Sequence, residues 1–185
     1  MTDARFVEKK GLLILSKAVI DLNQILDVKL TIIGLAQTHE QEEYRDLIKL
    51  TFKNAGILNK LEIPNNGKGV QIEQVIDIYQ NADIFIYAGV DTGKGDVDGV
   101  PNALLQAAFS GIPVITTQSG SIGDLFDENN SYLINQNDIH DIVIKFQELL
   151  KDNQRNNKIE KLYNQAAKEF SLNINTKELE GLFFK

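Results

Sequence analysis

Three polar side chains between Asp98 and Gln106 are the residues of this chain best placed to do chemistry. Asn102 and Gln106 are four residues apart in a predicted helix and therefore lie on one face, and Asp98 comes just before the helix begins. The first turn of a helix has free N–H groups and a partial positive charge, which attract an anion. The pattern indicates a ligand-binding site at the start of this helix.

Both ends of this helix have a local cause. Pro101 has the fixed φ that suits a first helical turn and Gly111 suits a left-handed stop, so we expect a helix from about Pro101 to Ser110. Its apolar residues cover most of its circumference, which predicts that it packs in the interior. Apolar strands at 84–87 and 114–117 precede and follow it. This order predicts a right-handed crossover between parallel strands, whose ligands bind beyond the carboxyl ends of the strands.

The rest of the chain continues the alternation of strands and helices. Further strands are predicted at 29–34, 60–63 and 132–134, and further helices at 11–22, 40–54, 72–79, 139–150 and 158–170. The loop at 118–124 is small and polar, and the backbone N–H groups of Gly120 and Ser121 are suited to cradle a phosphate. A plain turn between a strand and a helix is the alternative explanation of this loop.

Composition and charge limit the class of protein. With 185 residues, 43% of them hydrophobic, the chain is long enough for one domain with a sizeable core. It has no cysteine, no signal peptide and no apolar run near the roughly 18 residues of a membrane span, so we expect a cytoplasmic protein. The net charge of −7 disfavours nucleic acid and membrane surfaces as partners, so any cations that bind an anionic substrate must be local.

No hydrolytic or zinc-binding pattern is visible in the sequence. The two histidines, His39 and His140, have no serine or cysteine nucleophile motif near them and do not have the spacing of zinc ligands. We therefore expect both histidines at the surface and no metal site.

The stretch from Asp98 to Thr117 resembles the signature of the family-four (group 1) glycosyltransferases of GT-B architecture. That signature reads Glu, Gly, any residue, Pro, Asn, three residues, Glu, Ala, and further on Gly, any residue, Pro, Val. The matching residues are Asp98, Gly99, Pro101, Asn102, Gln106, Ala107, Gly111, Pro113 and Val114. The resemblance extends from residues 4–11 to residues 169–171, and it covers only the second half of such an enzyme.

This resemblance implies a fold and a function for the whole chain. The fold is α/β, a Rossmann-like parallel sheet with helices on both faces, and residues 1–185 form one nucleotide-sugar-binding domain without the N-terminal acceptor domain. The donor substrate is a UDP- or GDP-type nucleotide sugar, and transfer retains the anomeric configuration and needs no metal or cofactor. We expect the chain to be inactive alone and to require a separately encoded N-terminal half for transfer.

The resemblance also implies roles for particular residues. Arg5 and Lys10 hold the diphosphate of the nucleotide sugar and stabilise the charge that builds on the leaving phosphate. Asp98, Gly99 and Asn102 lie near the donor sugar. Ordinary solvated surface charges are the alternative reading of Arg5 and Lys10, and a residue that favours the helix dipole is the alternative reading of Asp98.

Two positions depart from the family pattern. Asp98 replaces a glutamate and is one methylene shorter, which changes the reach of the carboxylate. Gln106 replaces the second glutamate, which accepts hydrogen bonds from the ribose hydroxyls, and the loss of its charge weakens such a bond by about 1 kcal/mol. A polar residue at the edge of a buried helix is the alternative reading of Gln106.

A second hypothesis, from a different class, is a non-catalytic domain that binds a nucleotide or a partner, or a remnant of such an enzyme. It is supported by the short start of the chain and by the two altered acidic positions. An upstream reading frame that encodes a matching N-terminal half would favour a split enzyme. A flavodoxin-like binding domain is a third option, which the spacing from Asp98 to Val114 disfavours.

Overall fold

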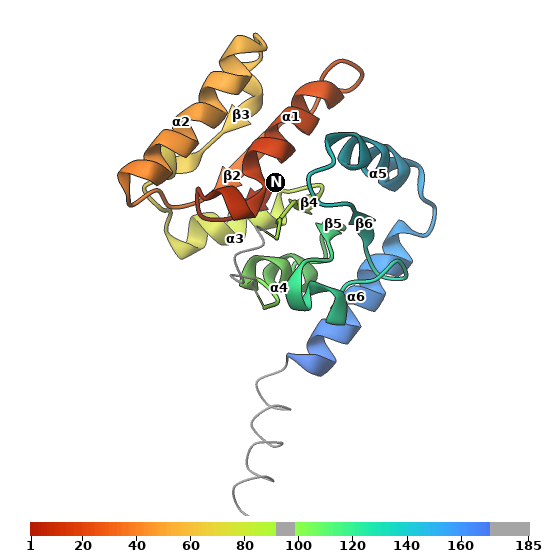
Figure 1. Ribbon diagram of the computed structural model, residues 1–185. Coiled ribbons are helices and arrows are strands. Elements are labelled where there is room, and N and C mark those ends of the chain that lie inside the picture. Colours follow the sequence, from red (N-terminus) through yellow and green to blue (C-terminus); the bar gives the residue numbers. More distant parts are fainter. Residues whose placement is uncertain (92–98, 171–185) are drawn as a thin grey trace, which may run out of the picture.

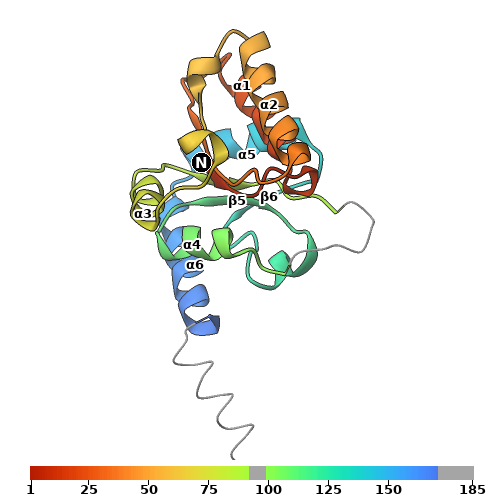
Figure 2. The ribbon, with the colours of Figure 1, turned by 90° about the vertical axis from the view of Figure 1, so that its left-hand side faces the viewer.

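Short parallel strands lie at the centre of the molecule, and helices pack on both sides of them (Figures 1 and 2). The computed structural model describes residues 1–91 and 99–170. The strands are β1 (Thr2–Asp3), β2 (Leu30–Ile33), β3 (Leu61–Glu62), β4 (Phe85–Tyr87), β5 (Val114–Thr117) and β6 (Tyr132–Ile134). The α-helices are α1 (Leu12–Leu22), α2 (His39–Asn54), α3 (Ile72–Gln80), α4 (Asn102–Phe109), α5 (Ile139–Lys151) and α6 (Arg155–Glu169). The predicted α/β, Rossmann-like fold is confirmed.

The strands form two parallel three-stranded sheets that meet edge to edge. One has the order β1-β2-β3 and the other β4-β5-β6. The Ile86 N–H donates to the carbonyl of Met1 at 2.9 Å, and the amino group of Met1 donates to the carbonyl of Ile84 at 2.6 Å. The combined strand order is therefore β3-β2-β1-β4-β5-β6. From β1 to β3 successive strands are added toward one edge of the sheet, and from β4 to β6 they are added toward the other edge. The order thus reverses between β1 and β4. In open α/β sheets this reversal opens a crevice at the carboxyl ends of the strands, where ligands bind.

Each face of the strands has its own hydrophobic core. The residues around β4 alternate between the two cores: Ile84 and Ile86 belong to the core that includes residues of α1, α2 and α5. Phe85 and Tyr87 belong to the core that includes residues of α3, α4 and α6. All four side chains are buried, as expected for a central parallel strand covered on both faces.

Helix α4 is less buried than its composition predicts. Leu104, Ala107 and Ala108 are buried, and α4 packs against α6. Phe109, however, is 44% exposed and contacts Tyr163 of α6 edge to face, with ring centroids 6.1 Å apart. The prediction of an interior helix is therefore wrong for the face of α4 that carries Phe109, because the sheet and α6 pack against the other face.

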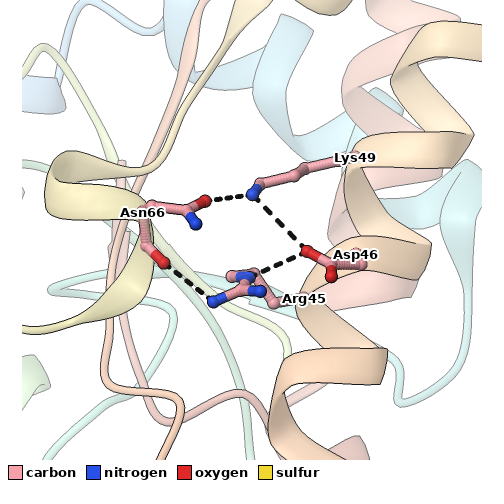
Figure 3. Close-up of polar contacts among 4 residues, drawn as sticks. All are labelled: Arg45, Asp46, Lys49 and Asn66. Carbon is pink, nitrogen blue, oxygen red and sulfur yellow. Dashed lines mark hydrogen bonds and ion pairs between the residues drawn. The ribbon is translucent and has the colours of Figure 1, made fainter.

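The loop after β3 is held in place by α2 (Figure 3). Within the 3₁₀ turn η3 (Pro64–Gly67), Asn65, Asn66 and Gly67 have left-handed φ values of 48°, 54° and 73°, a conformation that asparagine and glycine adopt most readily. Arg45 is 7% exposed, and its Nη1 donates to the carbonyl of Asn66 at 2.9 Å while its Nε donates to Asp46 at 2.9 Å. Lys49 donates to the side-chain oxygen of Asn66. These contacts fix the loop at the carboxyl edge of the strands.

Candidate functional site: a cleft between β1 and β4

A cleft of about 440 Å³ opens at the carboxyl ends of β1 and β4. It is lined by residues 3–5 at the end of β1, by Lys10, by Tyr87 at the end of β4, and by residues 99–103 at the start of α4. This is the point at which the strand order reverses, so the cleft lies where ligands of such sheets bind. Its size suits part of a small ligand.

Close backbone packing positions the turn that carries Lys10. After β1 the chain forms the 3₁₀ turn η1 (Glu8–Lys10) and ends it at Gly11, which has a left-handed φ of 64°. A Cβ at Gly11 would lie 1.8 Å from the carbonyl oxygen of Ala88, so only glycine allows this approach. The Val90 N–H also donates to the carbonyl of Lys9 at 2.9 Å. The turn after β1 and the chain after β4 are therefore held against each other.

The two predicted cations lie in this cleft. Arg5 is exposed, and Lys10 is half-buried. The Lys10 Nζ donates to the hydroxyl of Tyr87 at 3.2 Å and lies 5.3 Å from the centroid of the Tyr87 ring, within the range of a cation–π contact. An ammonium and a guanidinium that line one cleft are groups of the kind that bind anions.

The start of α4 forms the opposite side of the cleft. Pro101 precedes the helix with an extended backbone, and its own side chain makes no capping hydrogen bond to the first turn. Gly99 and Asn102 are exposed and line the cleft together with Ala103. The partial positive charge at the start of this helix is therefore added to that of Arg5 and Lys10.

Asp3 is an acidic residue of the cleft that the sequence analysis did not identify. The Tyr79 hydroxyl lies 3.3 Å from the Asp3 carboxylate and 3.3 Å from the carbonyl of Ala103, and its single proton is shared between them. Burial raises the pKa of the half-buried Asp3 carboxyl and also raises the pKa of the Tyr79 hydroxyl. No local signal marks Asp3 in the sequence, because its contact with Tyr79 joins residues that are 76 positions apart.

Other predicted site residues do not line this cleft. Gln106 is exposed on α4, one turn beyond Asn102. Gly120 and Ser121 are exposed in the 3₁₀ turn η4 (Gly120–Asp124) that follows β5. Asp98 lies outside the described residues. The structure thus brings together Arg5, Lys10, Gly99 and Asn102 of the predicted set, and the roles assigned to all these residues stay predictions.

A larger cavity of about 880 Å³ lies at the opposite edge of the strands. It is lined by residues that precede the strands, such as Lys29, Asp83 and Pro113, and by side chains of α5 and α6. It contains none of the predicted site residues. We assign the functional site to the smaller cleft because sheets of this topology bind ligands at their carboxyl edge.

Three further points concern metal ligands, the two histidines and membrane-spanning helices among the described residues. Within 1–91 and 99–170, no three or more His, Asp or Glu side chains form a group suited to a metal ion. His39 and His140 are both exposed, as predicted. Over the same ranges no helix has the length and apolar composition needed to cross a membrane.

A parallel sheet of this strand order, with a cleft where the order reverses, defines the class of a Rossmann-like α/β domain. Comparison with known families makes the assignment specific. The profile of the family described as glycosyl transferases group 1 matches residues 3–169. The chain belongs to this family.

Relatives of known name agree with this family. WcaL of Escherichia coli (strain K12), named for colanic acid biosynthesis, is 27% identical over 137 residues, which are 73% of this chain and 32% of that protein. The amylovoran biosynthesis glycosyltransferase AmsK of Erwinia amylovora is 28% identical over 129 residues, 69% of this chain and 30% of that protein. The chain spans about a third of the length of these curated relatives.

Solved structures share the fold. The C-terminal domain of the glycosyl transferase group 1 family protein LpcC from Francisella tularensis superposes with a TM-score of 0.77 at 22% identity, over 92% of this chain and 85% of that one. Anabaena Alr3699/HepE in complex with UDP and glucose gives a TM-score of 0.80 at 18% identity, over 98% of this chain and 47% of that one. The first match shows that the fold occurs as the C-terminal domain of a family member.

Proposed function

We propose that this chain is the donor-binding half of a glycosyltransferase and binds the diphosphate of a nucleotide sugar in the cleft between β1 and β4. The observation that carries the proposal is that Arg5 and Lys10 line one cleft with the start of α4, at the reversal of the strand order. Membership of the family and the UDP bound by a protein of the same fold support it.

The chemistry of the cleft suits a diphosphate. A nucleoside diphosphate carries several negative charges, and a guanidinium and an ammonium form charge-assisted hydrogen bonds with its oxygens. The same bonds strengthen as negative charge builds on the leaving phosphate during glycosyl transfer, so they lower the barrier to the reaction. In this proposal Asp98, Gly99 and Asn102 lie near the sugar, Gln106 binds the ribose, and Gly120 and Ser121 offer backbone N–H groups.

Finer points of the proposal rest on the family resemblance. They are a hexosyl donor of the UDP or GDP type, retention of the anomeric configuration, and no requirement for a metal or cofactor. We propose that residues 1–185 by themselves do not transfer sugar, because they span only about a third of the length of the curated relatives. Sugar transfer by the purified chain would contradict this part of the proposal.

Thermal unfolding with and without ligand tests the donor site. The purified chain is heated alone and with UDP, GDP and their sugar conjugates. A ligand at 100 times its dissociation constant adds about 2.7 kcal/mol, which raises the unfolding midpoint of a domain of this size by roughly 5 to 10 °C. We expect one nucleotide series to give this shift, and we expect Arg5→Ala and Lys10→Ala to abolish it. Lys17→Ala, an exposed lysine of α1 that does not line the cleft, is the matched control.

A non-catalytic nucleotide-binding or interaction domain is the second candidate. The observation that favours it is that Gln106, which has already lost the charge of the family glutamate, is exposed and does not line the cleft. A matching N-terminal half, encoded upstream and mixed with this chain, separates the two candidates: sugar transfer by the mixture supports the split enzyme. Nucleotide binding without transfer by the mixture supports the non-catalytic domain.

A further inference from the structure

Tyr87 connects the core of the protein to the donor cleft. It is the last residue of β4 and is 2% exposed, and it belongs to the core that includes residues of α4 and α6. It is nevertheless one of the residues that line the cleft. Its ring is therefore fixed by packing while its hydroxyl is at the edge of the site.

The ring of Tyr87 has little freedom to move. A Cβ at Gly89 would lie 2.3 Å from the Tyr87 ring, so glycine is needed there for the chain to pass. The carbonyl of Gly89 accepts a hydrogen bond of 2.7 Å from the Thr117 hydroxyl at the end of β5, which holds this backbone in place. The hydroxyl of Tyr87 is thus a fixed point of the cleft.

The side chain that donates to this hydroxyl is Lys10, which is long and flexible. A lysine side chain has many rotamers, and holding its ammonium in one position costs conformational entropy. Lys10 meets Tyr87 twice, through the hydrogen bond of 3.2 Å to the hydroxyl and through the ring face at 5.3 Å. Two other tyrosines of the protein, Tyr79 and Tyr132, donate their hydroxyls to carboxylates.

We propose that Tyr87 is a positioning residue that holds the Lys10 ammonium at the cleft for the diphosphate of the donor, an inference that rests on the donor-binding function proposed above. Tyr87 accepts a hydrogen bond from the ammonium and so fixes its place before the ligand arrives. A site whose charges are already placed loses less entropy when it binds. Nothing in the local sequence around Tyr87 indicates this role, because the residue ends an apolar strand 77 residues from Lys10.

Calorimetric titration with UDP and UMP, and in parallel with GDP and GMP, tests the proposal. Tyr87→Phe keeps the buried ring and removes only the hydroxyl. We expect it to weaken UDP or GDP binding about fivefold, the size of one net hydrogen bond, and to change monophosphate binding less than twofold. Tyr132→Phe, which removes a buried hydroxyl bonded to Asp152 and does not line the cleft, is the matched control and keeps wild-type affinity.

A double substitution separates positioning from general structural damage. Lys10→Met removes the ammonium and keeps most of the side-chain length. If Tyr87 acts through Lys10, then adding Tyr87→Phe to Lys10→Met causes no further loss of diphosphate affinity. An unchanged affinity of Tyr87→Phe alone, or an equal loss in both backgrounds, would overturn the proposal while leaving the donor-binding function in place.

A measurement without ligand covers the case in which the donor-binding function itself fails. The lysines are ¹³C-methylated reductively, and the Lys10 signal is assigned by its absence in Lys10→Arg. We expect the wild-type signal to be displaced from those of exposed lysines by the Tyr87 ring and to move back toward them in Tyr87→Phe. A signal that does not change in Tyr87→Phe overturns the positioning role. Absence of any nucleotide binding by the wild type overturns the donor-binding function alone.

Discussion

Two parts of the same sheet edge differ in what they bring together. Beyond β1 and β4, segments far apart in the sequence converge on one cleft that contains Arg5, Lys10 and Asp3. Beyond β5, the turn η4 presents Gly120 and Ser121 to solvent, and neither residue lines that cleft. Both parts are polar and rich in glycine in the sequence. The comparison teaches that the reversal of the strand order, and not the composition of a loop, makes the cleft.

Helix α4 begins at the cleft and ends near the opposite edge of the sheet, where β5 starts. Its first residue, Asn102, lines the cleft, whereas Gln106 lies one turn further along and does not. The spacing of four residues correctly places the two amides on one face of the helix. The cleft reaches only the first turn of that face, so a shared face did not mean a shared site.

The largest expected effect comes from the glycine contact that builds the cleft. Gly11→Ala forces a Cβ to within 1.8 Å of the Ala88 carbonyl at a left-handed φ of 64°. We expect it to lower the free energy of unfolding by on the order of 3 to 4 kcal/mol and the midpoint by about 10 °C. In the turn after β5, Gly123→Ala places a Cβ 3.8 Å from the Gln118 amide, an ordinary contact, and should change stability by less than about 0.5 kcal/mol.

Thermal unfolding of both glycine variants checks this difference. Similar midpoints for Gly11→Ala and the wild type would mean that the turn after β1 can move away from β4. In that case the close packing of Gly11 on Ala88 would not be what defines the cleft.

An intermediate effect on affinity tests how far the site extends along α4. If Gln106 binds the ribose as the family resemblance implies, Gln106→Ala should weaken UDP and UMP about fivefold and equally, because both ligands carry the ribose. Calorimetric titration measures the two affinities. Gln106→Glu restores the charge of the family residue and should tighten binding. Wild-type affinity in Gln106→Ala would confine the site to the cleft beyond β1 and β4.

The smallest expected effect concerns the acidic residue of the cleft. Burial raises the pKa of Asp3 in the folded state, so the favourable contribution of Asp3 is present below its unfolded pKa of about 4 and is lost as the pH rises through the folded value. Asp3→Asn keeps an oxygen for Tyr79 but does not ionise. At pH 7 we expect Asp3→Asn to unfold at a higher temperature than the wild type.

The pH dependence gives this prediction its control. The advantage of Asp3→Asn over the wild type should shrink as the pH falls through the raised folded pKa of Asp3, and it should be gone below about 4, where the wild-type carboxyl is protonated in both the folded and the unfolded states. Asp124→Asn changes an exposed carboxyl of η4 and should not show this pattern. A wild type that is as stable as Asp3→Asn at pH 7 would show that burial of Asp3 has no cost.

Local signals in the sequence predicted most of the elements. Strands β5 and β6 have the predicted bounds, and α4 begins and ends one residue inside the predicted range. These elements are marked by apolar runs and by a proline and a glycine at the helix ends, which act over a few residues. Asp3, Tyr87 and Arg45 gave no comparable signal. Their roles depend on contacts with residues distant in the sequence, and in the sequence they look like parts of ordinary strands and helices.

The sequence by itself determined the alternation of strands and helices, the two cations after β1 and the family signature around α4. Only the tertiary structure decided which of these residues share a cleft, since that depends on β1 lying beside β4. Met1 and Ile84, whose hydrogen bond joins these strands, are 83 residues apart. Propensity and capping act within a turn or two, whereas strand pairing follows from the burial of both sheet faces by helices throughout the chain.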